Sequence, residues 1–349
     1  MPLPPVKKTR YEHFFLGVLI IVAFFFRFYG MGDQLAVFGI LSELEQNHVF
    51  LSALFGTISI LLVYLLVRHI FGNWKIAAMS SFLLAVSSWH VWLSRSGSLA
   101  IIGSVTLLLS LVALWRAMAT ASRASFFLAG LLLGVSVYFY SWNWLFLICA
   151  GLTIAAYWLT VLRHLPHGHE YVRTKIAYGT GLFVAGAGLV ILPLQLGMLM
   201  LILSPPAVDV TFSLSSYSIL WPVSFLAAIG FLRACVKLFA HRKHRHFSTM
   251  IIFLLSWVAV GLIAASLQSS FSPSAGFIIL PVIFILAAET LWWAYDFIVK
   301  WYGESAKTVE VYGGSFVGEN MLTASATVII FLASVALVEY CRVFGFWLG

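Results

Sequence analysis

A few charged side chains in this apolar chain have the types needed to handle a phosphate group or a proton. Arg27 and Arg95 stand at the ends of two apolar runs, in FRFYG and WLSRSG. A guanidinium binds phosphate through two parallel hydrogen bonds, so both arginines are candidates for contact with a lipid phosphate. The alternative is that each anchors a helix end at the headgroups, which is the interpretation we favour for Arg27. For Arg95 the two interpretations carry equal weight.

The carboxylates available to accept a proton lie between the first two apolar runs. Asp33, Glu43 and Glu45 belong to the segment MGDQLAVFGILSELEQNH, and a carboxylate there can act as a general base. The same segment has the spacing of a short amphipathic helix lying in the interface. A solvated helix face is therefore the favoured interpretation, with Asp33 or Glu43 as the catalytic candidates only if the protein is active.

Histidines offer weaker signals. His90 precedes Arg95 by about one and a half helical turns and is flanked by Trp89 and Trp92, so a packing role is favoured over a ligand role. Two further segments, HLPHGH at 164–169 and HRKHRH at 241–246, place histidines at matching intervals. Interleaved Arg and Lys in the second segment would repel a divalent cation, and a basic face toward anionic lipid is favoured. We predict no metal site.

The composition requires these residues to be positioned by membrane-spanning helices. Of 349 residues, 62% are hydrophobic and only 9% are charged, and mean hydropathy is +1.01. A water-soluble protein is excluded because one core cannot hide so many apolar side chains, and the three scattered cysteines form no disulfide framework. We expect an all-α integral membrane protein with about eleven transmembrane helices and no large soluble domain. The predicted spans begin near Phe14, Phe50, Ile76, Ser98, Ser125, Trp144, Gly179, Tyr217, Thr249, Ala275 and Leu322.

The distribution of basic residues predicts the orientation. With the N-terminus inside, seventeen of the 20 Lys and Arg residues fall in inner segments, and only Arg27, Arg95 and Arg342 lie toward the outside. The positive-inside rule then places the C-terminus outside. Because the basic residues fall in short clusters between apolar runs, they indicate headgroup contacts and exclude a nucleic-acid partner.

Four segments in the first half carry a resemblance to a known family. They are FRFYG at 26–30, LSALFGTISILLVYLLVRHIFG at 51–72, LLAVSSWHVWLSRSG at 83–97 and GLLLGVSVYFYSW at 130–142. This pattern resembles the N-terminal membrane half of GT-C glycosyltransferases, in the family 39 or protein-mannosyltransferase-like branch. The resemblance implies one polytopic membrane domain over 1–349, with GT-C-like helices over 1–162 and divergent helices over 163–349. It also implies a bacterial cytoplasmic membrane as the location.

The family transfers a sugar from a polyprenyl-phosphate donor on the outer face of the membrane. For this chain the resemblance implies a lipid-phosphate site formed by Arg95, Arg27, His90, Tyr138 and Tyr140, bordering an outward groove. If active, the protein would be an inverting glycosyltransferase that uses a polyprenyl-phosphate sugar donor, with a divalent metal as an open alternative. Otherwise no cofactor is expected.

Departures from the family pattern favour a loss of activity. The first outer loop, at about 31–48, is short and has neither an adjacent acidic pair nor a proline. At three places where relatives carry a charged residue, this chain has apolar or small residues. These places are Leu99, the neighbourhood of Trp144, and 274–276. We therefore favour a degenerate, non-catalytic subunit or lipid-binding scaffold, whose partners are membrane lipids and other membrane protein subunits. The active glycosyltransferase remains the alternative.

Overall fold

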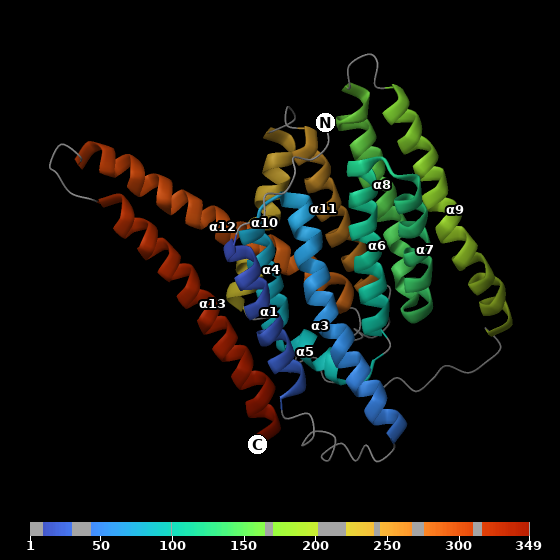
Figure 1. The fold of residues 1–349 in the computed structure, drawn as a ribbon, viewed down its shortest axis with the longest axis horizontal. Coiled ribbons are helices and arrows are strands. Elements are labelled where there is room, and N and C mark those ends of the chain that lie inside the picture. The colour runs from blue at the N-terminus through green and yellow to red at the C-terminus, as the bar shows by residue number, and fades with distance from the viewer. Residues whose placement is uncertain are drawn as a thin grey trace.

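The computed structural model describes residues 10–29, 43–98, 100–164, 170–201, 221–240, 245–266, 276–309 and 316–348. These residues form an all-helical bundle (Figure 1). Its elements in chain order are α1 (Arg10–Phe28), α3 (Glu43–Phe71), α4 (Trp74–Val86), α5 (Ser88–Arg95), α6 (Ala100–Thr120), α7 (Arg123–Phe139), η1 (Ser141–Leu145), α8 (Phe146–Thr160), η2 (Leu162–His164), α9 (Glu170–Leu201), α10 (Trp221–Ala240), α11 (Arg245–Ser266), α12 (Gly276–Val309) and α13 (Phe316–Leu348).

Membrane-spanning length is reached by eight of the described helices, or nine if the bent pair α4 and α5 counts as one span. The sequence predicts eleven spans, and each predicted run overlaps a helix or the bent pair. Helices α7 and α11 account for the difference, because their apolar stretches, Arg123–Phe139 and Ser248–Ala264, are short. The chain is an integral membrane protein by the length and apolar composition of these helices.

Packing is densest where small residues let helices approach. Helices α7 and α9 lie against each other, with α6 on the other side of α7. An added Cβ at Gly130 would come within 2.1 Å of the Phe183 carbonyl oxygen, and one at Gly186 within 2.7 Å of the Phe127 carbonyl oxygen. Glycine at these positions is what permits the contact, as is usual between membrane helices.

A buried ion pair joins α1 to α3 near the ends that carry the basic connections. The Glu12 carboxylate lies 3.0 Å from Arg68 Nε, and the Tyr64 hydroxyl donates to the same carboxylate at 2.7 Å. Glu12 and Arg68 are both buried, so each requires the other to offset the cost of leaving water. This pair holds α1 in register against α3, with Arg27 at the opposite end of α1.

The break between α4 and α5 is the feature that the hydropathy pattern does not reveal. The two helices meet at Ser87, whose ψ of 119° is not helical, and their axes differ by 59°. The sequence predicts one continuous span here. The eight residues of α5 instead run across the end of the bundle where α1 and α13 also end (Figure 1). The bend brings His90 and Arg95 beside the end of α1.

The last turns of α12 and the start of α13 project away from the rest of the bundle (Figure 1). Only 17% of the apolar stretch Leu322–Phe344 of α13 is buried within the protein, against 61% of Ile278–Trp301 in α12. Near its C-terminal end, α13 packs against α1 through aromatic side chains. Tyr340 and Phe344 contact Phe25 and Phe26, with ring centroids 6.1 to 6.4 Å apart.

Candidate functional site

Arg27 is the most deeply buried charged side chain of the candidate site, with no exposed surface. Its Nη1 donates to the carbonyls of Ala23 at 3.0 Å and Ala85 at 3.2 Å. Its Nη2 lies 2.6 Å from His90 Nδ1. The structure therefore does not support the anchoring interpretation, because the guanidinium faces helix ends and a histidine inside the bundle rather than headgroups.

The contacts of His90 determine its tautomer. Because guanidinium nitrogens only donate, Nδ1 accepts from Arg27 and the ring proton lies on Nε2. Nε2 is 3.1 Å from Ser59 Oγ, which in turn donates to the Gly56 carbonyl at 2.8 Å. His90 is thus a neutral hydrogen-bonded bridge between α1 and α3. This agrees with the packing role favoured from the sequence, and it places the ring in direct contact with a candidate site residue.

Arg95, at the end of α5, is the more accessible arginine of the pair, with 8% of its surface exposed. Its Nη2 donates to the Tyr29 carbonyl, and its guanidinium lies 5.6 Å from the centre of the Phe344 ring. Two of its nitrogens, Nε and Nη1, are buried without a hydrogen-bond partner among the described residues.

This pair of cations has no matching anion in the part of the chain that the structure describes. The ion pairs found there join Glu12 to Arg68, Glu289 to Arg233 and Lys237, and Asp296 to Lys300. Buried donors without acceptors are costly, and buried charges are normally paired. The arrangement of Arg27 and Arg95 therefore suits an anionic ligand with several oxygen acceptors.

The remaining predicted site residues lie apart from this group or outside the described residues. The Tyr138 hydroxyl donates to the Val190 carbonyl of α9 at 3.1 Å, and its side chain is half exposed. Tyr140 caps α7, where its backbone N–H donates to the Ser136 carbonyl. Asp33 lies outside the described residues, and Glu43 is described only as the first residue of α3. The outward groove stays a prediction.

Glu339 is a site residue that the sequence does not reveal. Its carboxylate accepts from the Ser88 backbone N–H at 3.0 Å, across 251 residues of chain. Ser88 opens α5, so a side chain of α13 caps the short helix that carries His90 and Arg95.

Metal binding has no support within the described ranges, where no three His, Cys, Asp or Glu side chains gather closely enough to hold an ion. Asp33 is not among these residues. Most of the histidine segments at 164–169 and 241–246 also lies outside the described residues, so the absence of a metal site stays a prediction.

Two comparisons identify the kind of protein to which this arrangement is similar. Residues 34–194, a little less than half of the chain, match the family described as dolichyl-phosphate-mannose-protein mannosyltransferase. The fold resembles ArnT from Cupriavidus metallidurans bound to undecaprenyl phosphate, with a TM-score of 0.52 and 15% identity over 97% of this chain and 76% of that one. The chain is a GT-C-like polytopic membrane protein.

A second solved structure supports the same fold. The oligosaccharyltransferase of Archaeoglobus fulgidus in the apo form is similar with a TM-score of 0.55 and 12% identity, over 85% of this chain. The chain spans less than half of that protein, 45% of its length. No curated protein matches the sequence. The GT-C-like architecture expected from the four sequence segments is therefore confirmed, whereas a degenerate status is not shown.

Gly56 is the position at which the packing of the candidate site is least tolerant. A Cβ there would lie 2.4 Å from the Ser94 Cβ and 3.1 Å from Arg27 Nε. We expect Gly56→Ala to push α5 away from α3 and lower the free energy of unfolding by about 1–3 kcal/mol, the usual cost of overpacking. Thermal denaturation in detergent measures this. Gly151→Ala is the matched control, because nothing lies within 4 Å of its added Cβ, and an equal loss in both variants would contradict the packing argument.

The cap on α5 gives a second prediction. Glu339→Ala removes the acceptor of the Ser88 N–H, so α5 should loosen at a cost of about 1–3 kcal/mol, typical of an unsatisfied buried group. Glu339→Gln retains a side-chain oxygen and should recover most of the thermal stability. The Ala and Gln variants are compared by melting temperature, and indistinguishable values would show that the cap is not important.

Proposed function

We propose that the chain is a membrane glycosyltransferase that uses a polyprenyl-phosphate sugar donor on the outer face of a bacterial cytoplasmic membrane. The observation that carries the proposal is the pair of buried Arg95 nitrogens that have no partner among the described residues, next to the buried charge of Arg27. A lipid phosphate supplies the oxygens that these donors lack. In this proposal Arg95 contacts the phosphate. Arg27 Nε faces Gly56, so Arg27 contributes its positive charge without contacting the phosphate.

The proposed reaction is a displacement at the anomeric carbon of the sugar. The acceptor oxygen attacks that carbon as its bond to the phosphate oxygen breaks, and the bonding electron pair leaves with polyprenyl phosphate. The acceptor proton passes to a carboxylate, for which Asp33 and Glu43 are the candidates. Arg95 and Arg27 stabilise the negative charge that develops on the leaving phosphate, in a site from which water is largely excluded. Inversion at the anomeric carbon follows from a single displacement.

The family match favours this proposal over the non-catalytic subunit that the sequence alone favours. The matching region begins at residue 34 and so includes most of the first outer loop, the segment taken from the sequence to be cut down. Because the family pattern includes this loop, the length of the loop gives little support for a loss of catalytic activity. Under this proposal, protein partner subunits are not required, and membrane lipids remain as partners.

The proposed membrane arrangement has eleven spans, with the N-terminus inside and the C-terminus outside. Helix α7 and the apolar part of α11 are at the short end of the range that crosses a bilayer, roughly 17 residues. Single cysteines at the exposed Tyr29 and Arg163 test the orientation, in a background where Cys149, Cys235 and Cys341 are replaced. An impermeant reagent added outside should label position 29 and leave position 163 unlabelled. The reverse pattern would overturn the orientation.

The binding step is tested by comparing two lipids that differ only in the phosphate. Purified protein should retain undecaprenyl phosphate and release undecaprenol in native mass spectrometry. Arg95→Ala should abolish this preference. Equal retention of phosphate and alcohol by the unmodified protein would contradict a phosphate site.

A further inference from the structure

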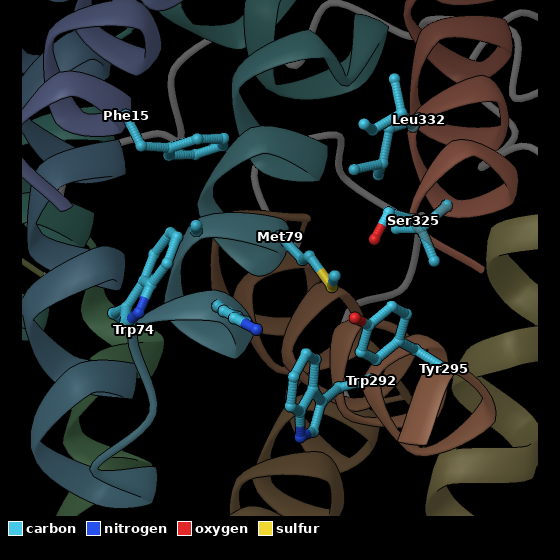
Figure 2. Close-up of a pocket in the computed structure, with 11 residues that line it drawn as sticks. Phe15, Trp74, Met79, Trp292, Tyr295, Ser325 and Leu332 are labelled. Carbon is cyan, nitrogen blue, oxygen red and sulfur yellow. The ribbon is translucent and has the colours of Figure 1, made fainter. Parts of the chain in front are cut away.

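A pocket lies toward the end of α4 that is farther from the candidate site. It has a volume of about 240 Å³ and is bounded by α1, α4, α12 and α13 (Figure 2). Its walls include Phe15, Trp74, Met79, Trp292 and Leu332, so the lining is almost entirely apolar. Met79 is the pocket residue of α4 nearest to α5, and it lies seven residues, or about 10 Å, before the end of α4 at Val86.

Lys75 is the cation of this pocket. Its Nζ lies 4.7 Å from the centre of the Trp292 ring and 5.7 Å from that of Tyr295. Among the described residues, no carboxylate forms an ion pair with it. Lys75 also stands in the first turn of α4, where the helix dipole disfavours a positive charge and favours a negative one. A bound anion would pair with the Lys75 ammonium and would also interact favourably with the helix dipole.

One wall of the pocket is formed by α13, a helix that contacts little protein. Along α13, Ile329 and Ile330 are each 64% exposed and Leu322 is 72% exposed. Ile329 and Leu332 also contribute to the pocket wall. Leu332 lies across the pocket from Phe15 (Figure 2). Lipid is the solvent available to such a surface in a membrane protein. The volume is below the roughly 300–1,000 Å³ of a pocket for a whole small molecule, which suits part of one acyl chain.

We propose that this pocket binds an anionic glycerophospholipid, with an acyl chain between α4 and α13 and its phosphate at Lys75. Tryptophan and tyrosine, which line the pocket beside Lys75, are the residues that favour the headgroup level of a bilayer. The apolar walls accept the chain, and the lysine selects the charge of the headgroup. This site is distinct from the Arg95 site, and it does not depend on glycosyl transfer.

The test measures retention of phosphatidylglycerol and phosphatidylcholine by the purified protein in native mass spectrometry. The unmodified protein should prefer phosphatidylglycerol. Lys75→Gln should reduce that preference about fivefold, as expected when one lysine near a membrane surface is lost. Lys300→Gln is the matched control, because it makes the same charge change at a side chain that is 71% exposed and already paired with Asp296. It should leave the preference unchanged.

A second variant tests the pocket itself. Met79→Trp should fill the space and displace the acyl chain, so retention of phosphatidylglycerol should fall although Lys75 remains. Melting temperature checks that this variant is folded. Equal retention of both lipids by the unmodified protein, or an unchanged preference in Lys75→Gln, would overturn the proposal. Neither outcome bears on the donor site, since no sugar donor is present in the assay.

Discussion

Replacing Arg95 by alanine should lower the rate of sugar transfer from a polyprenyl-phosphate donor by about 10²–10³-fold, the usual cost of removing one donor that stabilises developing charge. The reason is that Arg95 Nε and Nη1, at the end of α5, are buried donors with no partner in the part of the chain that the structure describes. Arg95→Lys should recover only part of the rate, because an ammonium keeps the charge but lacks the planar fork. Initial rates with a radiolabelled donor measure the effect.

The control for this prediction is Arg116→Ala. Arg116 is exposed near the end of α6 that carries basic residues, so its loss removes one positive charge without touching the candidate site. Its transfer rate should stay within about twofold of the unmodified protein. Comparable rates for Arg95→Ala and Arg116→Ala would exclude Arg95 from the reaction.

Removing the proton acceptor should have an equal or larger effect. Asp33→Asn or Glu43→Gln should lower the transfer rate by about 10²–10⁴-fold, because a positioned general base typically contributes that much. Each substitution keeps the size of the side chain and removes its charge. Glu45→Gln serves as the control, since Glu45 lies in the same segment and is not a candidate base. Near-normal rates in both Asp33→Asn and Glu43→Gln would mean that the base lies elsewhere.

The helices of this fold are largely predictable because lipid imposes a simple rule on sequence. Only backbone that satisfies its own hydrogen bonds crosses a bilayer, so each long apolar run must be helical. The break at Ser87 escapes this rule. Neither proline nor glycine marks it in LLAVSSWHV. The next residue, Ser88, donates its backbone N–H to Glu339, which belongs to a helix 251 residues away in the sequence.

The candidate site is predictable in its residue types but not in its geometry. Arg27, His90 and Arg95 stand out in the sequence because charged and imidazole groups are rare in apolar runs. The burial of Arg27, however, depends on the Ala85 carbonyl and on His90, both about 60 residues away. Ser59 gives no sequence signal at all, since serine is common in the interior of membrane helices and only its contact with His90 distinguishes it.

Transfer by the purified protein is the most direct test of the account. The protein is placed in liposomes with a polyprenyl-phosphate donor labelled in the sugar, and a membrane extract supplies the acceptor. We predict time-dependent loss of label from the donor, release of polyprenyl phosphate, and loss of both in Arg95→Ala. If folded protein binds polyprenyl phosphate but leaves the donor intact, the glycosyltransferase proposal is wrong and the non-catalytic lipid-binding subunit takes its place.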